Sequence, residues 1–513
     1  ISDSIDDTKY QLRDLGSIYP IFRVMYETEI YENGFALVDE APEKESVINE
    51  PAPNISEVPE LNGEKHDFTI TDENLGVGGA KSKFKANVEA IKLLNELEFE
   101  NRRATPKEQE VLSKYVGWGG LAQAFDENNS AWSSEFTELY MLLSPDEYES
   151  AKASTLNAHY TSPTVINAMY EGLENLGFKG GNVLEPAMGV GNFFGVMPEE
   201  MRSGKLYGVE LDSISGRIAK QLYQNADIQI SGFEKTSFPD NFFDVAVGNV
   251  PFGQYKLAEK RYDKLNLNIH DYFFAKSLDK VRAGGVVAFV TSKGTLDKAN
   301  PQFRKYLAQR AELLGAIRLP NNAFKDNAGT EVTSDIIFLQ KRDKMLDIEP
   351  DWVRLGQTED GVPVNKYFEQ HPEMVLGEMK QGVEFSMYGN ADETACVPIE
   401  GASLKEQLKE AIANIHGTIP EVEQENTEKV AESIPADPNV RNFSYAVVDD
   451  KLYFRENSRM FLKDDLPKAT EERIKGMCEL RDCVRTLIDY QLNEYSDYDI
   501  RSQQTELNRV YDD

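Results

Sequence analysis

Cysteine is scarce in this chain of 513 residues, which holds only Cys396, Cys478 and Cys483. These residues form no CxxC pair, so their spacing predicts neither a zinc site nor a disulfide framework, and we expect reduced thiols. Long apolar runs are missing as well. No stretch reaches the length of a membrane span and no signal-peptide pattern opens the sequence, so we expect a cytoplasmic protein with no membrane partner and no metal.

Basic residues are in the minority. The sequence has 55 Lys and Arg residues against 88 Asp and Glu residues, a formal net charge of -33, which argues against general adhesion to nucleic acid. The acidity is uneven, because residues 151–342 hold 23 basic and 20 acidic residues while the remainder holds 32 and 68. The acidic charge therefore belongs to the flanks, and the central segment can still meet a phosphate backbone locally.

Composition and periodicity divide the chain into five parts. We expect an N-terminal arm and linker over residues 1–64, a helical extension over 65–150, and a central domain over 151–342. An acidic linker region over 343–440 and a β-hairpin with a helical segment over 441–513 follow. Because the chain starts at a residue other than Met and its last helical pattern ends without a cap, we expect that it continues into a further domain.

Several elements in the flanks have local signals. The apolar spacing predicts an amphipathic helix over residues 81–100. Residues 445–454 form a predicted β-hairpin with Asp449-Asp450 in its turn, and a helical pattern runs from Glu471 to the end. The run 420–439 has few apolar residues, so we expect it to be disordered.

The central domain alternates between short β-branched runs and helical stretches, which is the pattern of a parallel sheet covered on both faces. The last two predicted strands follow each other without a full helix between them, so we expect an antiparallel pair at the edge of the sheet. The predicted strands are 182–185, 205–210, 227–231, 244–248, 285–291, 314–319 and 334–340, and the predicted helices are 195–201, 213–225 and 271–281.

One strand of this set ends in an unusual polar turn. The run from Phe243 to Gly248 stops at Asn249-Val250-Pro251-Phe252, and the carboxyl ends of parallel strands are where a ligand crevice forms. The Asn249 side chain and the Val250 carbonyl offer two acceptors, while proline has no N–H to compete. Two converging acceptors suit an exocyclic NH₂ group, and the Phe252 ring adds a flat face on which a planar ring could stack.

This turn resembles the (D/N)-P-P-(Y/F/W) motif of amino methyltransferases, which move a methyl group from S-adenosylmethionine (SAM) to an exocyclic nitrogen, most often N6 of adenine in DNA. Val250 replaces the first proline and keeps the main-chain carbonyl that the chemistry uses. The strand pattern also resembles the Rossmann-like, seven-stranded α/β sheet of SAM-dependent methyltransferases. The resemblance implies that fold, with a helical N-terminal extension and an acidic, partly disordered α+β flank at the C-terminus. It makes Asn249, Val250, Pro251 and Phe252 the catalytic residues.

The segment from Glu185 to Phe193 is similar to the (D/E)-P-A-x-G-x-G-x-F cofactor motif of the same enzymes. Its glycines let the backbone approach a ligand, and Phe at position 194 breaks the G-x-G-x-x-G spacing of a dinucleotide site. In the family, one acid accepts both ribose hydroxyls, a second contacts the adenine amino group, and a Y-x-T-P-type segment closes over the methionine end. The resemblance implies cofactor binding by Tyr160, Thr161, Glu185, Pro186, Ala187, Gly189, Gly191, Asn192, Phe193, Glu210 and Glu234.

The order of these motifs is that of the gamma class of amino methyltransferases. Together with residues 115–120 and 157–163, they look like the methyltransferase part of the very large methyltransferase–helicase proteins of phages and conjugative elements. This resemblance implies DNA, duplex or single-stranded, as the partner, a flipped adenine as the target, and a helicase domain in the same full-length chain. Phe324 is a candidate second stacking face for the base, and Lys256 is a candidate phosphate contact.

Two other functions stay open. Protein N5-glutamine methyltransferases use a near-identical N-P-P-Y motif, because a Gln side chain also presents an amide NH₂ group. A non-catalytic interpretation makes the chain a DNA-loading or anti-restriction scaffold with a vestigial site. The intact set of Glu185, Glu210, Glu234 and Asn249 argues against such decay.

Overall fold

The computed structural model describes residues 9–13, 22–26, 63–72, 75–155, 160–253, 255–325, 331–385, 390–421, 433–437, 440–456, 459–464, 466–492 and 495–512. Contacts within the chain divide it into two units, residues 1–60 and 61–513. In the first unit, β1 (Lys9–Arg13) pairs antiparallel with β2 (Phe22–Tyr26), and the rest of the predicted arm up to residue 62 lies outside the described residues. None of the described helices is long and apolar enough to span a membrane.

Seven strands form the central sheet of the second unit: β3 (Val183–Glu185), β4 (Leu206–Glu210), β5 (Asp227–Ile230), β6 (Phe243–Asn249), β7 (Val281–Ser292), β8 (Ala311–Leu319) and β9 (Ser334–Lys341). Their order is β5-β4-β3-β6-β7-β9-β8. The first five strands in this order are parallel, whereas β9 is antiparallel to both β7 and β8. All seven predicted strands and the antiparallel pair are confirmed. Strand β9, the last of the seven in the sequence, lies between β7 and β8, so β8 forms the edge of the sheet.

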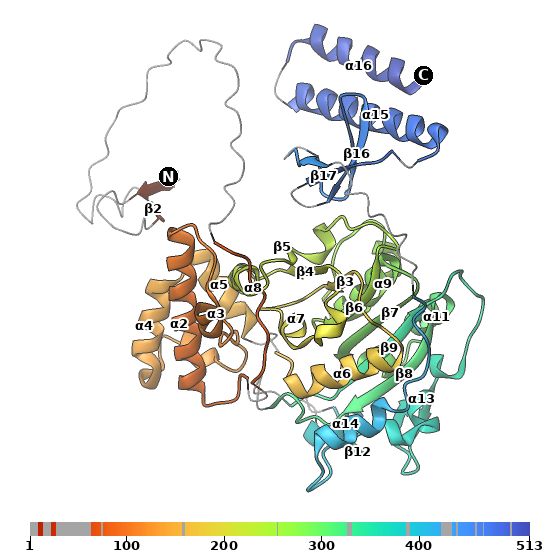
Figure 1. Ribbon diagram of the computed structural model, residues 1–513. Helices are drawn as coiled ribbons and strands as arrows, with labels where there is room; N and C mark the ends of the chain where they lie inside the picture. Colours follow the sequence, from red (N-terminus) through yellow and green to blue (C-terminus); the bar gives the residue numbers. More distant parts are fainter. Residues whose placement is uncertain are drawn as a thin grey trace, which may run out of the picture. The chain divides into compact units, whose positions relative to one another are not determined.

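Helices connect these strands and cover both faces of the sheet (Figure 1): α6 (Pro163–Asn175), α7 (Asn192–Val196), α8 (Ser213–Leu222), α9 (Ile269–Lys280), α10 (Gly294–Asp297) and α11 (Gln302–Arg310). The predicted helix over 195–201 is wrong in its bounds. Helix α7 ends at Val196, and a separate 3₁₀ turn follows over Glu199–Met201. Pro198 lies between them, and its missing N–H cannot continue the helical hydrogen bonds.

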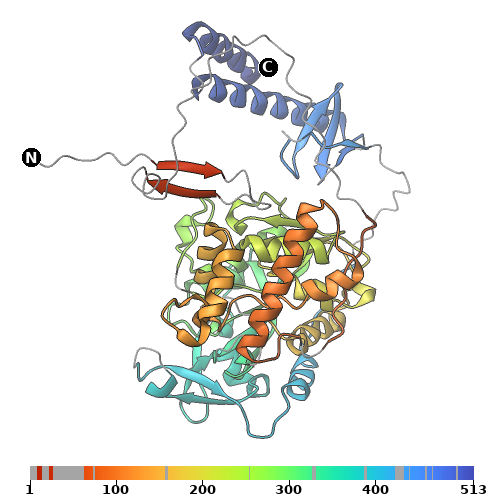
Figure 2. The ribbon, with the colours of Figure 1, turned by 90° about the vertical axis from the view of Figure 1, so that its left-hand side faces the viewer.

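The helical extension is confirmed as a helical layer, and its hydrophobic core continues into α8 and the loop after β3, through residues such as Ile218 and Met188. It consists of α2 (Ala80–Phe99), α3 (Pro106–Leu112), α4 (Ser133–Leu142) and α5 (Pro145–Ser154), with 3₁₀ turns η1 (Ala122–Phe125) and η2 (Ser130–Trp132). Thr105 closes a capping box with Glu108 at the start of α3, and Trp118 is buried among other aromatic rings. Helices α2 and α3 pack on α8, and Figures 1 and 2 show this layer beside the sheet domain.

Residues 343–421 differ from the predicted acidic linker. They form β10 (Leu355–Gln357), β11 (Pro363–Asn365), α13 (Lys366–Gln370), β12 (Glu378–Gln381), β13 (Thr394–Val397) and α14 (Leu404–Ile412). Side chains from this segment, among them Trp352, Phe368 and Leu408, are buried in the same hydrophobic core as the sheet. The expectation of a linker over this stretch is therefore wrong. Most of the run 420–439, predicted to be disordered, lies outside the described residues.

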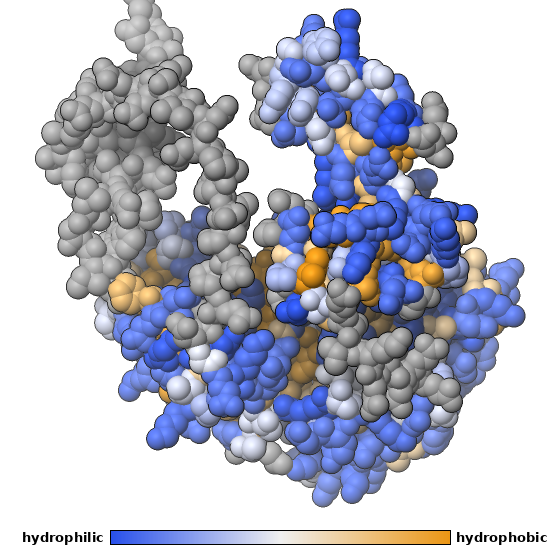
Figure 3. Space-filling model, turned by 45° about the horizontal axis from the view of Figure 1, so that its top comes forward, coloured by the Kyte–Doolittle hydropathy of each residue, from blue (hydrophilic) through white to orange (hydrophobic). Residues whose placement is uncertain are grey.

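The C-terminal part forms a four-stranded antiparallel sheet and two helices. The strands are β14 (Ser433–Pro435), β17 (Arg459–Leu462), β16 (Lys451–Glu456) and β15 (Tyr445–Val448), in that order. The predicted hairpin is confirmed, with positive φ at Asp449 and Asp450 in its turn. The helical pattern from Glu471 to the end was predicted as one helix, but the structure has two, α15 (Lys468–Leu492) and α16 (Asp497–Asp512). Ser496 caps the start of α16, because its hydroxyl accepts from the Asp499 N–H. The face shown in Figure 3 is largely hydrophilic.

Candidate active site

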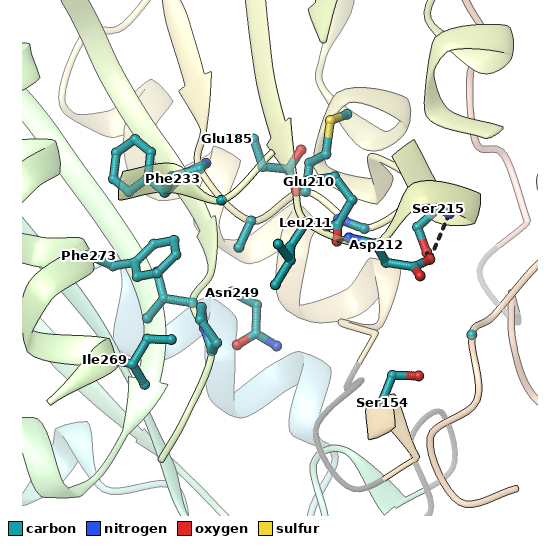
Figure 4. Close-up of a pocket in the computed structure, with 18 of the residues that line it drawn as sticks. Ser154, Glu185, Glu210, Leu211, Asp212, Ser215, Phe233, Asn249, Ile269 and Phe273 are labelled. Atoms are coloured by element: carbon teal, nitrogen blue, oxygen red, sulfur yellow. Dashed lines mark hydrogen bonds between the residues drawn. The ribbon is translucent and has the colours of Figure 1, made fainter. Parts of the chain in front are cut away.

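The carboxyl ends of β3, β4 and β6 open onto one cavity of about 410 Å³. Glu185 ends β3, Glu210 ends β4 and Asn249 ends β6. Strand β4 lies on one side of β3 and β6 on the other, so the cavity opens where the strand order reverses, which is where open α/β sheets bind ligands. Figure 4 shows the three side chains around a common space.

Most of the sequence-predicted site residues meet in this cavity. The cofactor candidates and the polar turn come from five separate stretches of the chain, and the fold brings them together. The predicted residues that line the cavity are Tyr160, Thr161, Glu185, Pro186, Ala187, Gly189, Asn192, Phe193, Glu210, Glu234, Asn249, Val250, Pro251 and Phe252.

Gly191 does not line the cavity and instead allows a tight backbone turn before α7. It precedes α7 with φ of +84°, and a Cβ atom there would lie 2.5 Å from the ring of Tyr223 and 2.9 Å from Met188. Glycine is therefore needed at this position to turn the backbone against a packed core. Gly189, by contrast, lines the cavity with φ of +55°, and its own Cβ would lie 3.2 Å from the Tyr160 ring.

The two substrate candidates also lie outside the cavity. Phe324 is only 1% exposed and packs into the main core, so its ring cannot stack on a base, and that expectation is wrong. Lys256 is exposed and donates to the Asn266 side-chain oxygen at 2.6 Å. The aromatic residues that line the cavity besides Phe252 include Phe233 and Phe273, whose ring centroids are 5.1 Å apart.

Two carboxylates give the cavity its electrostatic character. Glu210 accepts hydrogen bonds from the backbone N–H groups of Gly189 and Asp212, each at 2.7 Å. Burial, with a contribution from the charge of Asp212, raises the pKa of Glu210 to about 7. Burial also raises the pKa of Glu185 well above its usual range, with a smaller contribution from Glu210. Oε2 of Glu185 has no hydrogen-bond partner within the part of the chain that the structure describes, which leaves it for a ligand's polar group.

A hydrogen bond joins two of the predicted motifs. Nδ2 of Asn249 donates to the buried Thr161 hydroxyl at 3.0 Å. With the amide nitrogen assigned to this bond, Oδ1 is the acceptor atom on the other side of the amide group. Thr161 precedes β3 by about twenty residues and Asn249 follows it by about sixty, so only the fold brings them together. The sequence analysis did not foresee this contact.

The helical extension supplies a wall of the cavity that the sequence analysis missed. Its lining residues are Tyr115, Gly117, Ser150, Ala153 and Ser154. Fully buried Asn87 holds the turn before Gly117, because its Oδ1 accepts from the Val116 N–H at 2.9 Å and its Nδ2 donates to the Gly117 carbonyl at 2.6 Å. The glycines on either side of Trp118 were the signal in the sequence that could have indicated this wall. Gly117 and Gly120 have positive φ, and glycine is used where the backbone turns tightly or approaches another group closely.

The seven-stranded order with an antiparallel β9, the glycine loop after β3 and the acid after β4 define the class of Rossmann-like, SAM-dependent methyltransferases. Within that class, residues 133–324 match the family of Eco57I restriction-modification methylases. The central part of this chain is therefore similar to the methyltransferase domain of that family.

Individual relatives are more distant. The Defense against restriction protein B of Escherichia phage P1 is 29% identical over 263 residues, which make up 50% of this chain and 10% of that protein. The chain thus spans about a tenth of the length of the curated relative that it matches.

Two solved structures match part of the chain at low identity. A structure described as a class I SAM-dependent methyltransferase from Listeria monocytogenes shares 17% identity at a TM-score of 0.35, covering 53% of this chain and 90% of its own. A type I restriction-modification methyltransferase subunit from Streptococcus thermophilus shares 18% identity at a TM-score of 0.32, covering 50% and 65%.

Proposed function

We propose that this domain transfers a methyl group from SAM to the exocyclic N6 atom of adenine in DNA. The observation that carries the proposal is that Asn249-Val250-Pro251-Phe252 faces the same cavity as Glu185 and Glu210. A pair of acceptors with a stacking face therefore adjoins a pair of acids beside a glycine loop. This is the arrangement that an amino-group methyltransferase needs, because acceptor and cofactor have to meet in one space.

The cofactor end fits SAM. The cavity volume of about 410 Å³ lies within the range of ligand sites. The Glu210 carboxylate would accept from the ribose hydroxyls, since it is an acceptor fixed by two backbone N–H groups. Glu234 would meet the adenine amino group, and Glu185 with its unpartnered oxygen would meet the amino acid end. When bound, SAM supplies an electrophilic methyl group on a sulfonium sulfur.

The target end is built to raise the reactivity of an amino nitrogen. The lone pair of adenine N6 is delocalised into the ring, so the amino group is a poor nucleophile until that pair is localised. Oδ1 of Asn249 and the Val250 carbonyl would hold its two N–H bonds and aim the nitrogen into the cavity. The Phe252 ring would stack on the base, and the proton that the methylated nitrogen sheds would pass to solvent.

DNA has to present the base outside the stack. Inside a duplex N6 is paired, so the base must be flipped or the strand must already be single, at a cost of a few kcal/mol. The full-length protein would act in the cytoplasm and would carry further domains. A helicase domain is our proposal for one of them, because a protein that separates strands would present such bases.

A labelling experiment tests the proposal. The full chain is incubated with methyl-labelled SAM and, separately, with duplex DNA, single-stranded DNA, RNA and a protein release factor. We expect the label in DNA, as N6-methyladenine after digestion to nucleosides. Label confined to a glutamine of the release factor would favour the N5-glutamine alternative. SAM binding without transfer to any acceptor would favour the scaffold.

A further inference from the structure

A fully buried lysine lies behind the cavity, in the middle of α9. Lys276 Nζ donates to the Phe233 carbonyl at 2.7 Å and to Oε2 of Glu259 at 2.9 Å. The same Nζ lies 4.8 Å from the centroid of the Phe233 ring. One ammonium group therefore contacts two segments that are separate in the sequence.

The first of these segments belongs to the cofactor end. Phe233 and Glu234 form the 3₁₀ turn η4 (Phe233–Lys235) after β5, and both line the cavity. Lys276 binds this turn through a main-chain carbonyl. Its position is therefore tied to the backbone that presents Glu234.

The second segment is the loop that follows the Asn249-to-Phe252 turn. Tyr255 and Leu257 from this loop line the cavity, and Glu259 anchors the loop to α9. The hydroxyl of Tyr272, also on α9, donates to the same Glu259 oxygen. The loop is thus fixed at Glu259 by two donors from one helix.

A charge in this place is costly. Withdrawing an ammonium group from water costs several kcal/mol unless a partner and hydrogen bonds compensate, and an apolar side chain would fill the space among the α9 aromatics without that cost. The carboxylate of Glu259 and the carbonyl of Phe233 together provide the compensation. Both segments therefore depend on the position of Lys276, and a displacement of either segment changes the contacts that Lys276 makes with the other.

We propose that Lys276 is a positioning residue that links the turn at the cofactor end to the loop at the substrate end, so that filling the first orders the second. The identity of the two ligands rests on the proposed function. Lys276 touches neither ligand in this arrangement and acts through Phe233 and Glu259.

The same helix provides a matched control. One turn further on, Lys280 Nζ donates to the Phe238 carbonyl at 2.6 Å and to Asp240 at 2.7 Å. This ion pair has the same chemistry, but neither Phe238 nor Asp240 lines the cavity. Asp240 also pairs with Arg261 of the loop at 2.9 Å. Asp240→Asn therefore removes a charge that contacts the loop outside the cavity, while the bonds from Lys276 to Phe233 and Glu259 stay in place.

Amide hydrogen exchange of the full chain, with and without SAM, measures the link. In the parent and in Asp240→Asn we expect SAM to slow exchange across residues 255–266 by at least about fivefold, the lower range of an allosteric coupling. In Glu259→Gln we expect less than about twofold, with SAM affinity nearly unchanged. Lys276→Met should lose the coupling and also bind SAM more weakly. If Lys276→Met does not fold, the measurement on Glu259→Gln still tests the coupling.

Kinetics give a second readout. Glu259→Gln should raise KM for the DNA acceptor more than it lowers kcat, because the loop is less ordered while the reacting groups remain. If SAM protects the loop equally in Glu259→Gln and in the parent, the link does not exist. If the parent does not bind SAM, the proposed function fails, but the link is still tested, because Glu259→Gln should then speed exchange at Phe233–Lys235 and Asp240→Asn should not.

Discussion

Asn249 donates to the Thr161 hydroxyl, and this hydrogen bond helps to orient its amide group in the cavity. The side chain has an acceptor to offer a target amino group, while in our proposal Glu210 supplies the acceptor for the ribose of the cofactor. We therefore predict that Asn249→Ala binds SAM with nearly parental affinity and loses about 10²–10³ in methyl transfer, as when an oriented polar group is removed from another active site. Calorimetry and single-turnover transfer measure the two quantities.

Thr161→Val is the companion variant, because it keeps the Asn249 amide and removes one partner that orients it. It should lose less than Asn249→Ala. Transfer to adenine at the parental rate by Asn249→Ala would mean that the reacting amino group binds elsewhere.

Phe252 contributes a ring face and no polar group to the cavity. We predict that Phe252→Ala weakens acceptor binding by about 1–3 kcal/mol, the usual worth of a base stacked on an aromatic side chain, whereas Phe252→Trp retains most of the activity. Steady-state KM values for an oligonucleotide acceptor measure the change. Equal losses in the Ala and Trp variants would contradict a stacking role.

Glu210 makes cofactor binding sensitive to pH. Its pKa of about 7 before binding arises mainly from burial. Ribose hydroxyls donate to the ionised form, so binding lowers this pKa and releases a proton when Glu210 starts protonated. We predict that SAM affinity is nearly constant above pH 8 and falls by up to about tenfold between pH 8 and pH 6. Calorimetry in buffers of different ionisation enthalpy measures the proton, and Glu210→Gln should remove the dependence.

At the scale of elements, the turn that ends the α2–α3 region is packed directly on the cavity wall. Gly117 has φ of +67°, and a Cβ atom there would lie 2.6 Å from the Tyr160 ring. We predict that Gly117→Ala lowers the free energy of unfolding by about 1–2 kcal/mol for backbone strain and about 1–3 kcal/mol for overpacking, and weakens SAM binding. Gly401→Ala is the control, since φ is +78° there and nothing lies within 4 Å. Denaturant unfolding should show a smaller loss for it.

The elements differ in how far the sequence predicted them. Several strands of the central sheet contain continuous apolar runs, such as Val286 to Val290, that are buried on both faces, and such a run predicts a buried strand directly. Trp352 and Phe368 lie in short apolar pairs, Trp352-Val353 and Tyr367-Phe368, between charged residues, so composition suggested a linker where the fold buries them. The position of Ser150 in the cavity wall could not be predicted from the sequence, because it depends on how a separate helical layer packs against the sheet domain. Phe324 was misjudged because the motif order gave its position in the chain but not the direction of its side chain.

At the scale of the whole molecule, the folding unit extends further than the methyltransferase motifs. Helix α14 packs on α6, and the Ile419 N–H donates to the Leu176 carbonyl at 2.7 Å. We predict that a chain of residues 61–421 is soluble and binds SAM, whereas a chain of residues 61–345 aggregates because it exposes the core that Trp352, Phe368 and Leu408 cover. Gel filtration and calorimetry test the pair, and a soluble, SAM-binding 61–345 chain would contradict it.

The position of β9 between β7 and β8 also limits when the sheet can form during synthesis on the ribosome. Strand β8 leaves the exit tunnel before β9 does, and neither β7 nor β8 has its sheet neighbour on that side until Ser334–Lys341 emerges. During this interval β7 and β8 both present open edges of unpaired N–H and C=O groups, with apolar side chains such as Phe289 and Ile317 beside them. A ribosome that stalls when β8 has emerged but Ser334–Lys341 is still inside the tunnel therefore holds an aggregation-prone nascent chain, and a chaperone would have to cover that edge until translation resumes.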